Sequence, residues 1–128
     1  MTERAVPQGK LVIQTVAMPA DTNAHGDIFG GWLVSHMDMG AGIAARHRAK
    51  SRSVTVAIDS LEFINRVNVG DTVCCYADII KVGRTSMQIH IEVWTTPLTS
   101  MEQNKVAKGI FTFVAIDEQR KPHPVDRD

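Results

Sequence analysis

The chain is 128 residues long, the size of one domain, and 44% of its residues are hydrophobic and 22% charged, as in ordinary globular proteins. Fourteen basic residues balance fourteen acidic ones. No overall charge therefore draws the protein to nucleic acid or to an anionic membrane surface, and neither is an expected partner. Any anionic ligand must be held by a local cluster of cations.

The N-terminal region has no long apolar core and carries Glu3, Arg4 and Lys10, which is not typical of a signal peptide. No run of about 18 apolar residues predicts a membrane span. The two cysteines, Cys74 and Cys75, are adjacent, and in a strand they would point to opposite faces. They match neither a disulfide framework nor a CxxC pair, so a reducing cytoplasm is the expected location.

Polar segments at residues 1–8 and 120–128 flank one predicted domain that spans the chain, 1–128. Residues 11–17 (LVIQTVA) predict a short strand, which ends at the turn-forming residues that follow it. Residues 31–49 predict a long helix, because apolar residues recur in it every four positions. These residues are Leu33, Met37, Ala41 and Ala45. Gly40 and Gly42 each cost such a helix about 1 kcal/mol relative to alanine, and close packing against a sheet is the expected compensation.

From residue 53 onward the apolar period changes to two, which predicts strands at residues 53–63, 72–82, 85–94 and 105–117. Val54, Val56 and Ile58 are expected on one face of the first of these strands. The third alternates most cleanly, with its apolar face formed by Met87, Ile89, Ile91 and Val93. Residues 82–85 (VGRT) predict a tight hairpin between two strands.

The predicted order is a strand, a long helix and then four strands in series. Strands and helices do not alternate, so a parallel doubly wound sheet is excluded. A helix of 18 residues is about 27 Å long, enough to cover one face of an antiparallel sheet. The sequence therefore predicts an α+β fold, a long central helix wrapped by a curved antiparallel sheet.

Residues 21–32 (DTNAHGDIFGGW) carry the clearest chemical signal in the chain. Asp27 lies just before the helix, and Gly30 and Gly31 open it. The first turn of a helix has free N–H groups, and glycine lets a ligand carbonyl approach them closely. Such donors stabilise an oxyanion by about 3–4 kcal/mol each, and a carboxylate beside them could activate water or attack directly.

Asp27 and Asn23 also have purely structural interpretations. Asp27 could be the N-cap of the helix, and Asn23 could form an Asx-turn rather than orient a substrate or water.

Three segments, DTNAHGDIFGGWLVSHMD, VTVAIDSLEFINRVNVGDTV and KVGRTSMQIHIEVW, carry a resemblance to the YciA-like acyl-CoA thioesterases, which have the hotdog fold. The similarity runs from about residue 11 to residue 116. It implies hydrolysis of acyl-CoA to a free acid and CoA, without a metal or other cofactor. It also implies a homo-oligomer, a dimer or a trimer of dimers, with each site between two subunits.

The resemblance also assigns roles to residues. It implies that Asp27 is the catalytic carboxylate, that Asn23 helps to place substrate or water, and that Gly30 and Gly31 supply the backbone donors. It places the acyl and pantetheine region along Val54, Thr55, Val56 and Ala57. It places the phosphates of CoA at the hairpin that contains Lys81, Gly83, Arg84, Thr85 and Ser86. The sequence departs from the family pattern at His25, where a small or amide residue is expected.

Other polar residues have two interpretations each. Arg66 could contact a phosphate or be solvated, like any one of the hairpin cations. The run Arg46, Arg48, Lys50 and Arg52 could bind the 3′-phosphate of CoA, but solvation at the helix end is favoured. Asp38 could be a second carboxylate of the site, but an outward-facing charge is favoured.

Alternative functions are weaker. The five histidines have no HExxH or paired spacing, so no metal site is predicted, and the GxSxG, GxGxxG and P-loop patterns are absent. A hydratase or dehydratase of this fold would pair an acid with a histidine a few residues later, but the fifth residue after Asp27 is Trp32. An acyl-CoA-binding sensor without turnover is the alternative from another class.

Overall fold

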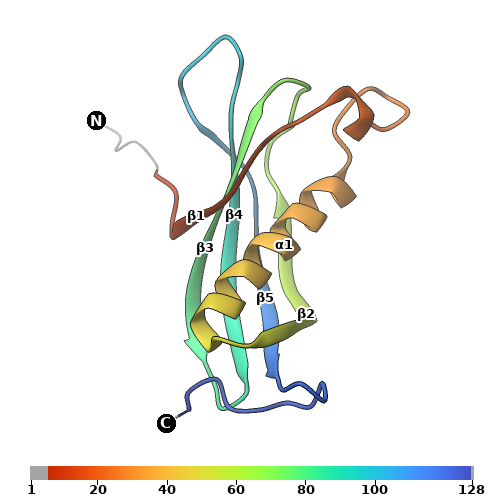
Figure 1. Ribbon diagram of the computed structural model, residues 1–128. Helices are drawn as coiled ribbons and strands as arrows, with labels where there is room; N and C mark the ends of the chain where they lie inside the picture. The colour runs from red at the N-terminus through yellow and green to blue at the C-terminus, as the bar shows by residue number, and fades with distance from the viewer. Residues whose placement is uncertain (1–5, 128) are drawn as a thin grey trace.

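One antiparallel sheet and one long helix form the part of the chain that the computed structural model describes, residues 6–127 (Figure 1). The sheet has the strand order β1-β3-β4-β5-β2, and α1 crosses one of its faces. The elements are β1 (Lys10–Val16), a 3-10 turn (Pro19–Asp21), α1 (Gly30–Ala49), β2 (Arg52–Phe63), β3 (Thr72–Val82), β4 (Ser86–Thr96) and β5 (Asn104–Ile116). This confirms the predicted α+β class. No helix among the described residues is long and apolar enough to cross a bilayer.

The core lies between α1 and the sheet. The four apolar residues predicted on one face of β4 are all buried, with at most 1% of their surface exposed. The four predicted on one face of α1 are buried as well, with at most 4% exposed: Leu33, Met37, Ala41 and Ala45. Each β4 residue in this set faces the helix because side chains alternate along a strand. The predicted hairpin is present as well, since the Gly83 N–H donates to the carbonyl oxygen of Ser86 at 2.8 Å.

The two mid-helix glycines have different surroundings. A Cβ atom on Gly40 would lie 3.0 Å from Cγ2 of Val12 and 3.3 Å from Cδ1 of Ile91. A Cβ atom on Gly42 would lie 3.4 Å from the ring of Phe113, which is ordinary contact. The predicted close packing against the sheet is therefore found at Gly40 and not at Gly42.

The prediction that Val54, Val56 and Ile58 share one face of β2 is wrong. Val54 pairs with Val114, whereas Ile58 pairs with the buried Phe111, and cross-strand partners lie on the same face of a sheet. Val114 and Phe111 are three residues apart, so their faces are opposite. The physical reason is a register shift between Thr55 and Ala57, a β-bulge that adds one residue and reverses the alternation.

The C-terminal polar segment packs against the end of α1. Val125 is buried and its N–H donates to the carbonyl oxygen of Arg84. Arg127 donates to the carbonyl oxygen of Ala49 at 2.9 Å, and Arg48 pairs with Asp126 at 2.7 Å. A cation on the last carbonyl of a helix compensates the negative end of its dipole.

A buried carboxylate ties the N-terminal segment to the sheet. Glu92 is only 3% exposed. It accepts hydrogen bonds from Nε1 of Trp94 at 2.8 Å and from the Gln8 N–H at 3.2 Å, and Nζ of Lys105 lies 3.1 Å away. Burial alone would raise the pKa of Glu92, but these hydrogen bonds and the ion pair together hold it below its usual value.

We expect Gly42→Ala to stabilise the protein and Gly40→Ala not to. Alanine improves helix propensity by about 1 kcal/mol, and at Gly42 the new methyl group meets only ordinary contacts. At Gly40 overpacking against Val12 offsets that gain. Denaturant unfolding of the two variants measures the difference. An equal gain in both would contradict the packing explanation for Gly40.

We also expect Glu92 to make the free energy of unfolding fall as the pH becomes acidic. Because its pKa is lowered in the folded state, its contribution is complete above the ordinary value of 4.5 and is lost as the pH falls through the lower, folded value. Glu92→Gln should unfold more easily at neutral pH, by about 1–3 kcal/mol, and should lose less stability on acidification. Glu62→Gln is the control, because Glu62 is an exposed partner of Lys108. If the free energy of unfolding fell equally on acidification in wild type and in Glu92→Gln, this role of Glu92 would be refuted.

Candidate active site

The loop before α1 is built around Asn23. Its Oδ1 accepts hydrogen bonds from the N–H groups of His25 at 2.8 Å and Asp27 at 3.2 Å. Gly26 adopts a positive φ of 82° between them, a conformation that favours glycine. The Asx-turn interpretation of Asn23 is therefore present. The N-cap of α1 is Phe29, so Asp27 is not the cap.

Asp27 lies in a shallow, exposed setting. Its carboxylate is 3.5 Å from Nε of Arg66, and the two side chains are 42% and 69% exposed. The hollow beside it has a volume of 220 Å³ and is also lined by Gly30 and Phe63. This volume is below the range of about 300–1,000 Å³ that is common for ligand pockets. Gly30 and Gly31 lie in the first turn of α1, whose N–H groups lack acceptors within the helix.

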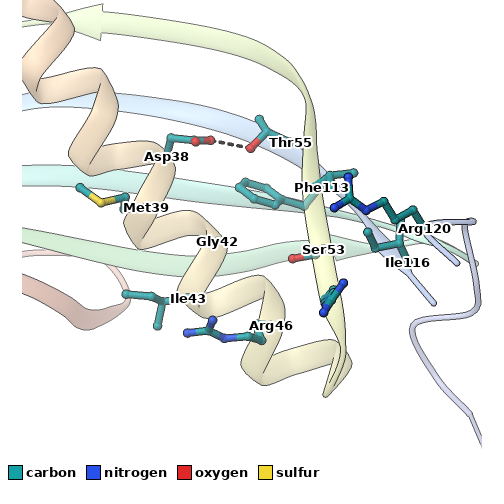
Figure 2. A pocket seen from close by; sticks show the side chains of 12 residues that line it. Asp38, Met39, Gly42, Ile43, Arg46, Ser53, Thr55, Phe113, Ile116 and Arg120 are labelled. Atoms are coloured by element: carbon teal, nitrogen blue, oxygen red, sulfur yellow. Dashed lines mark hydrogen bonds between the residues drawn. The ribbon is translucent and has the colours of Figure 1, made fainter. Parts of the chain in front are cut away.

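A larger cavity lies elsewhere, between the C-terminal half of α1 and the start of β2 (Figure 2). Its volume is about 830 Å³, well within the ligand-pocket range. The floor comes from β5 and from the turn that follows it. The lining residues are Asp38, Met39, Gly42, Ile43, Arg46, Arg52, Ser53, Val54, Thr55, Phe113, Ile116 and Arg120.

Opposite charges stand at the two ends of this cavity. At one end the hydroxyl of Thr55 donates to Oδ1 of Asp38 at 2.6 Å, as Figure 2 shows. At the other end stand Arg46, two turns further along α1, and Arg52, the first residue of β2. Arg120 reaches the cavity from the turn after β5. Apolar side chains lie between the ends, among them Met39, Ile43 and Phe113.

The structure brings together only some of the predicted site residues. Asn23, Asp27, Gly30 and Gly31 gather at the N-terminal end of α1, and Val54 and Thr55 line the cavity. Val56 is the extra residue of the bulge, and Ala57 pairs with Thr112 on the face away from the helix. The Lys81–Ser86 hairpin lies beyond the C-terminal end of α1 (Figure 1). A helix of 20 residues, about 30 Å long, separates it from Asp27.

One sequence expectation needs correction. Asp38 is not an outward-facing charge, because it accepts a hydrogen bond from Thr55 and lines the cavity. The cationic run is exposed along its length, as expected. Within it Arg48 is paired with Asp126, whereas Arg46 and Arg52 border the cavity. A signal for this was available in the sequence, since Asp38, Gly42 and Arg46 recur every four residues and so share one helix face.

Both cysteines are free and buried, as their position in β3 predicts. Burial raises the pKa of Cys75 to about 12, so the thiol is protonated and inert at neutral pH. It is therefore no candidate nucleophile.

Comparison with known proteins identifies the family to which the chain belongs. A family model described as the thioesterase superfamily matches residues 25–101. The acyl-CoA thioester hydrolase YciA of Salmonella typhimurium is 50% identical over 122 residues, which cover 93% of this chain and 92% of that protein. YciA of Escherichia coli is 49% identical over 124 residues, which cover 94% of each.

Two solved structures are also similar. The hexameric thioesterase y2039 from Yersinia pestis has a TM-score of 0.91 and 48% identity, covering 96% of this chain and 100% of that one. HI0827, a hexameric broad specificity acyl-coenzyme A thioesterase, has a TM-score of 0.90 and 46% identity, covering 97% and 86%. The chain therefore belongs to the thioesterase superfamily, in the YciA-like acyl-CoA thioester hydrolase family with the hotdog fold.

Proposed function

We propose that this protein hydrolyses acyl-CoA thioesters to free carboxylic acid and CoA, using carboxylate chemistry and no cofactor. The relatives named above are acyl-CoA thioester hydrolases, which supports the substrate class. The observation that carries the proposal is the cavity between α1 and β2, long and mainly apolar, with the Asp38 carboxylate at one end. A thioester with an elongated carrier arm fits such a cavity.

Asp38 has the stronger claim to be the reactive carboxylate within one chain. It borders the 830 Å³ cavity, and the hydrogen bond from Thr55 fixes the orientation of its carboxylate. Asp27, the candidate from the sequence, borders a hollow of 220 Å³ and faces Arg66. A carboxylate acts on a substrate only where the substrate can be held beside it. We therefore assign to Asp38 the role of general base or nucleophile.

The loop of Asn23 and Asp27 has a different role in this proposal. The first-turn N–H groups of Gly30 and Gly31 lie about 11 Å along α1 from Asp38, too far to bind an oxyanion beside it in the same chain. We propose that this loop serves the cavity of a second copy. There the free N–H groups would polarise the thioester carbonyl, and Asn23 or Asp27 would help to place substrate or water.

The edge of the sheet supports such an assembly. Among the described residues, β2 pairs with a strand on one side only, and it exposes apolar side chains: Val54 at 43%, Val56 at 55%, Ile58 at 45% and Phe63 at 51%. An exposed apolar edge strand readily pairs with another chain. The two solved relatives named above are hexameric. We propose a dimer through β2 that assembles further into a trimer of dimers.

We expect Asp38→Asn to lower kcat for butyryl-CoA by about 10²–10⁴-fold, the usual contribution of a positioned acid or base. Asp27→Asn is the matched control and should lower it much less. Release of CoA thiol measures both, and the buried cysteines of the folded protein add no background. A larger loss in Asp27→Asn than in Asp38→Asn would return the catalytic role to Asp27. Binding of the thioester without thiol release by wild type would favour the sensor.

Single turnover in oxygen-labelled water separates the two mechanisms of the same carboxylate. Label recovered in Asp38 identifies a covalent anhydride that water opens at the carboxyl carbon of Asp38. Label only in the product acid excludes that route and leaves attack of water at the acyl carbon, which a general base promotes.

We expect Val56→Lys to break the assembly, because a lysine on an edge strand opposes pairing with another strand. Its mass by sedimentation velocity should fall below that of wild type, and its thioesterase activity should fall with it. Leu98→Lys is the control, since Leu98 is 81% exposed in a loop outside β2. An unchanged mass for Val56→Lys would exclude β2 as the interface.

A further inference from the structure

His90 carries the one buried side-chain nitrogen or oxygen atom that has no hydrogen-bond partner among the described residues, Nδ1. His90 lies on β4 and, because side chains alternate along a strand, on the face of the sheet away from α1. Its side chain is 16% exposed, and Nδ1 lies 3.8 Å from Oε2 of Glu92, too far for a hydrogen bond. Burying such an atom costs free energy unless it gains a partner in another state of the molecule.

Two carboxylates face His90 from β3 and β4. Asp78 lies directly opposite it on β3, where Cβ atoms of paired residues are about 4.5–5.5 Å apart. Glu92 is two residues further along β4, on the same face. Tyr76, opposite Glu92 on β3, accepts a hydrogen bond from Gln103 at 3.1 Å and adds no charge.

The cations near His90 come from β5. The residue directly opposite His90 on that strand is the apolar Ile110. Nζ of Lys105 lies 3.1 Å from Oε2 of Glu92. Lys108, opposite Glu92, pairs instead with an exposed carboxylate of β2 at 3.6 Å. The cluster therefore holds two carboxylates against one ammonium group, and a positive charge on His90 would balance it.

The same two carboxylates hold residues 6–9, the N-terminal segment. The N–H of Gln8 donates to Oε1 of Glu92 at 3.2 Å, and its Nε2 donates to Oδ2 of Asp78 at 2.8 Å. Gly9 lets the chain turn onto the sheet, because its φ is 102° and a Cβ atom would overlap a carbonyl oxygen of β3. The segment brings no charged side chain of its own. Its attachment therefore depends on the charges that surround Asp78 and Glu92.

The two ring nitrogens of His90 have different surroundings. Glu92 favours the tautomer with the hydrogen on Nδ1, because a lone pair there would face a carboxylate oxygen. Nε2 is not a buried atom without a partner, so it is the nitrogen that takes up a proton from solvent. The proton makes the ring a cation and its Nδ1–H a charge-assisted donor, which forms shorter and stronger hydrogen bonds.

We propose that His90 is a proton-operated clamp for the N-terminal segment: protonation draws its Nδ1–H onto Glu92 and fastens residues 6–9 more firmly to the sheet. The imidazolium lies next to both carboxylates that hold Gln8 and reduces their mutual repulsion. The attachment is therefore strongest at mildly acidic pH and weakens as the pH rises and the proton leaves. The clamp and the cavity lie on opposite faces of the sheet, so this inference does not rest on the proposed hydrolase activity.

Glu92 stays ionised while the clamp operates. Histidine changes its charge between about pH 5 and 8. Burial opposes the charge of Glu92, but its hydrogen bonds and its ion pair with Lys105 hold its pKa below the usual value. The effect of His90 is thus separated in pH from the acid loss of stability that belongs to Glu92 itself.

The test measures exchange of the Gln8 amide with water by NMR in the full-length protein, at about pH 6 and about pH 8, on either side of the ordinary titration of histidine. Rates are corrected for the intrinsic effect of pH. Wild type should gain about tenfold protection at the lower pH, the size expected for one charge-assisted hydrogen bond. His90→Gln, which cannot take up a proton, should be equally protected at both. His47→Gln is the matched control, because His47 is an exposed histidine of α1, and it should behave as wild type.

A second measurement needs no variant and stands even if His90→Gln fails to fold. The ring carbons of His90 and the amide nitrogen of Gln8 are titrated together in wild type, and they should shift with one midpoint. Separate midpoints would overturn the proposal. Protection of Gln8 that stays constant or falls on acidification of wild type would overturn it as well. The same pH dependence in His90→Gln as in wild type would assign the effect to a carboxylate and reject the clamp.

Discussion

The structure depends on how closely α1 approaches the sheet, and this approach is uneven. Over β3 and β4 the helix is held at short range, because Gly40 leaves no room between its backbone and the side chains of Val12 and Ile91. At Gly42 the packing is looser, since a Cβ atom there would meet only the ring of Phe113, at an ordinary contact distance of 3.4 Å. Gly42 and Phe113 both line the cavity, which lies on this side of the helix.

The cations near the C-terminal end of α1 also differ in their surroundings. The chain has no net charge, yet the cations at the end of α1 fall into two groups. Arg48 and Arg127 are used for structure, the first paired with Asp126 and the second bound to the last carbonyl groups of the helix. These contacts compensate the negative end of the helix dipole. Arg46 and Arg52 instead border the cavity. They create a local positive potential there, although the protein as a whole has no net charge.

The elements could be predicted from the sequence because their periods are strong. The apolar residues of β4 that face the helix occupy every second position from Met87 to Val93, and the apolar face of α1 repeats every four residues. The site was less accessible, because it depends on contacts between elements. The partnership of Asp38 with Thr55 requires the register of β2, which a bulge shifts. Arg120 lies in a segment whose prolines and charges are typical of a tail, and only the turn at Asp117 brings it to the cavity.

The polarity of the cavity also bears on substrate range. If the thioester lies beside Asp38, the carrier arm occupies the length of the cavity along the C-terminal half of α1. The acyl chain must then continue past Asp38, toward the N-terminal half of α1. In the proposed assembly that region is where the loop of Asn23 and the exposed Phe29 of a second copy would lie. The surface that limits acyl length would therefore be formed between chains. Pocket depth would change with the fit of two copies even where the residues around Asp38 stay the same, because a wall shared by two subunits is set by their interface and not by either fold alone.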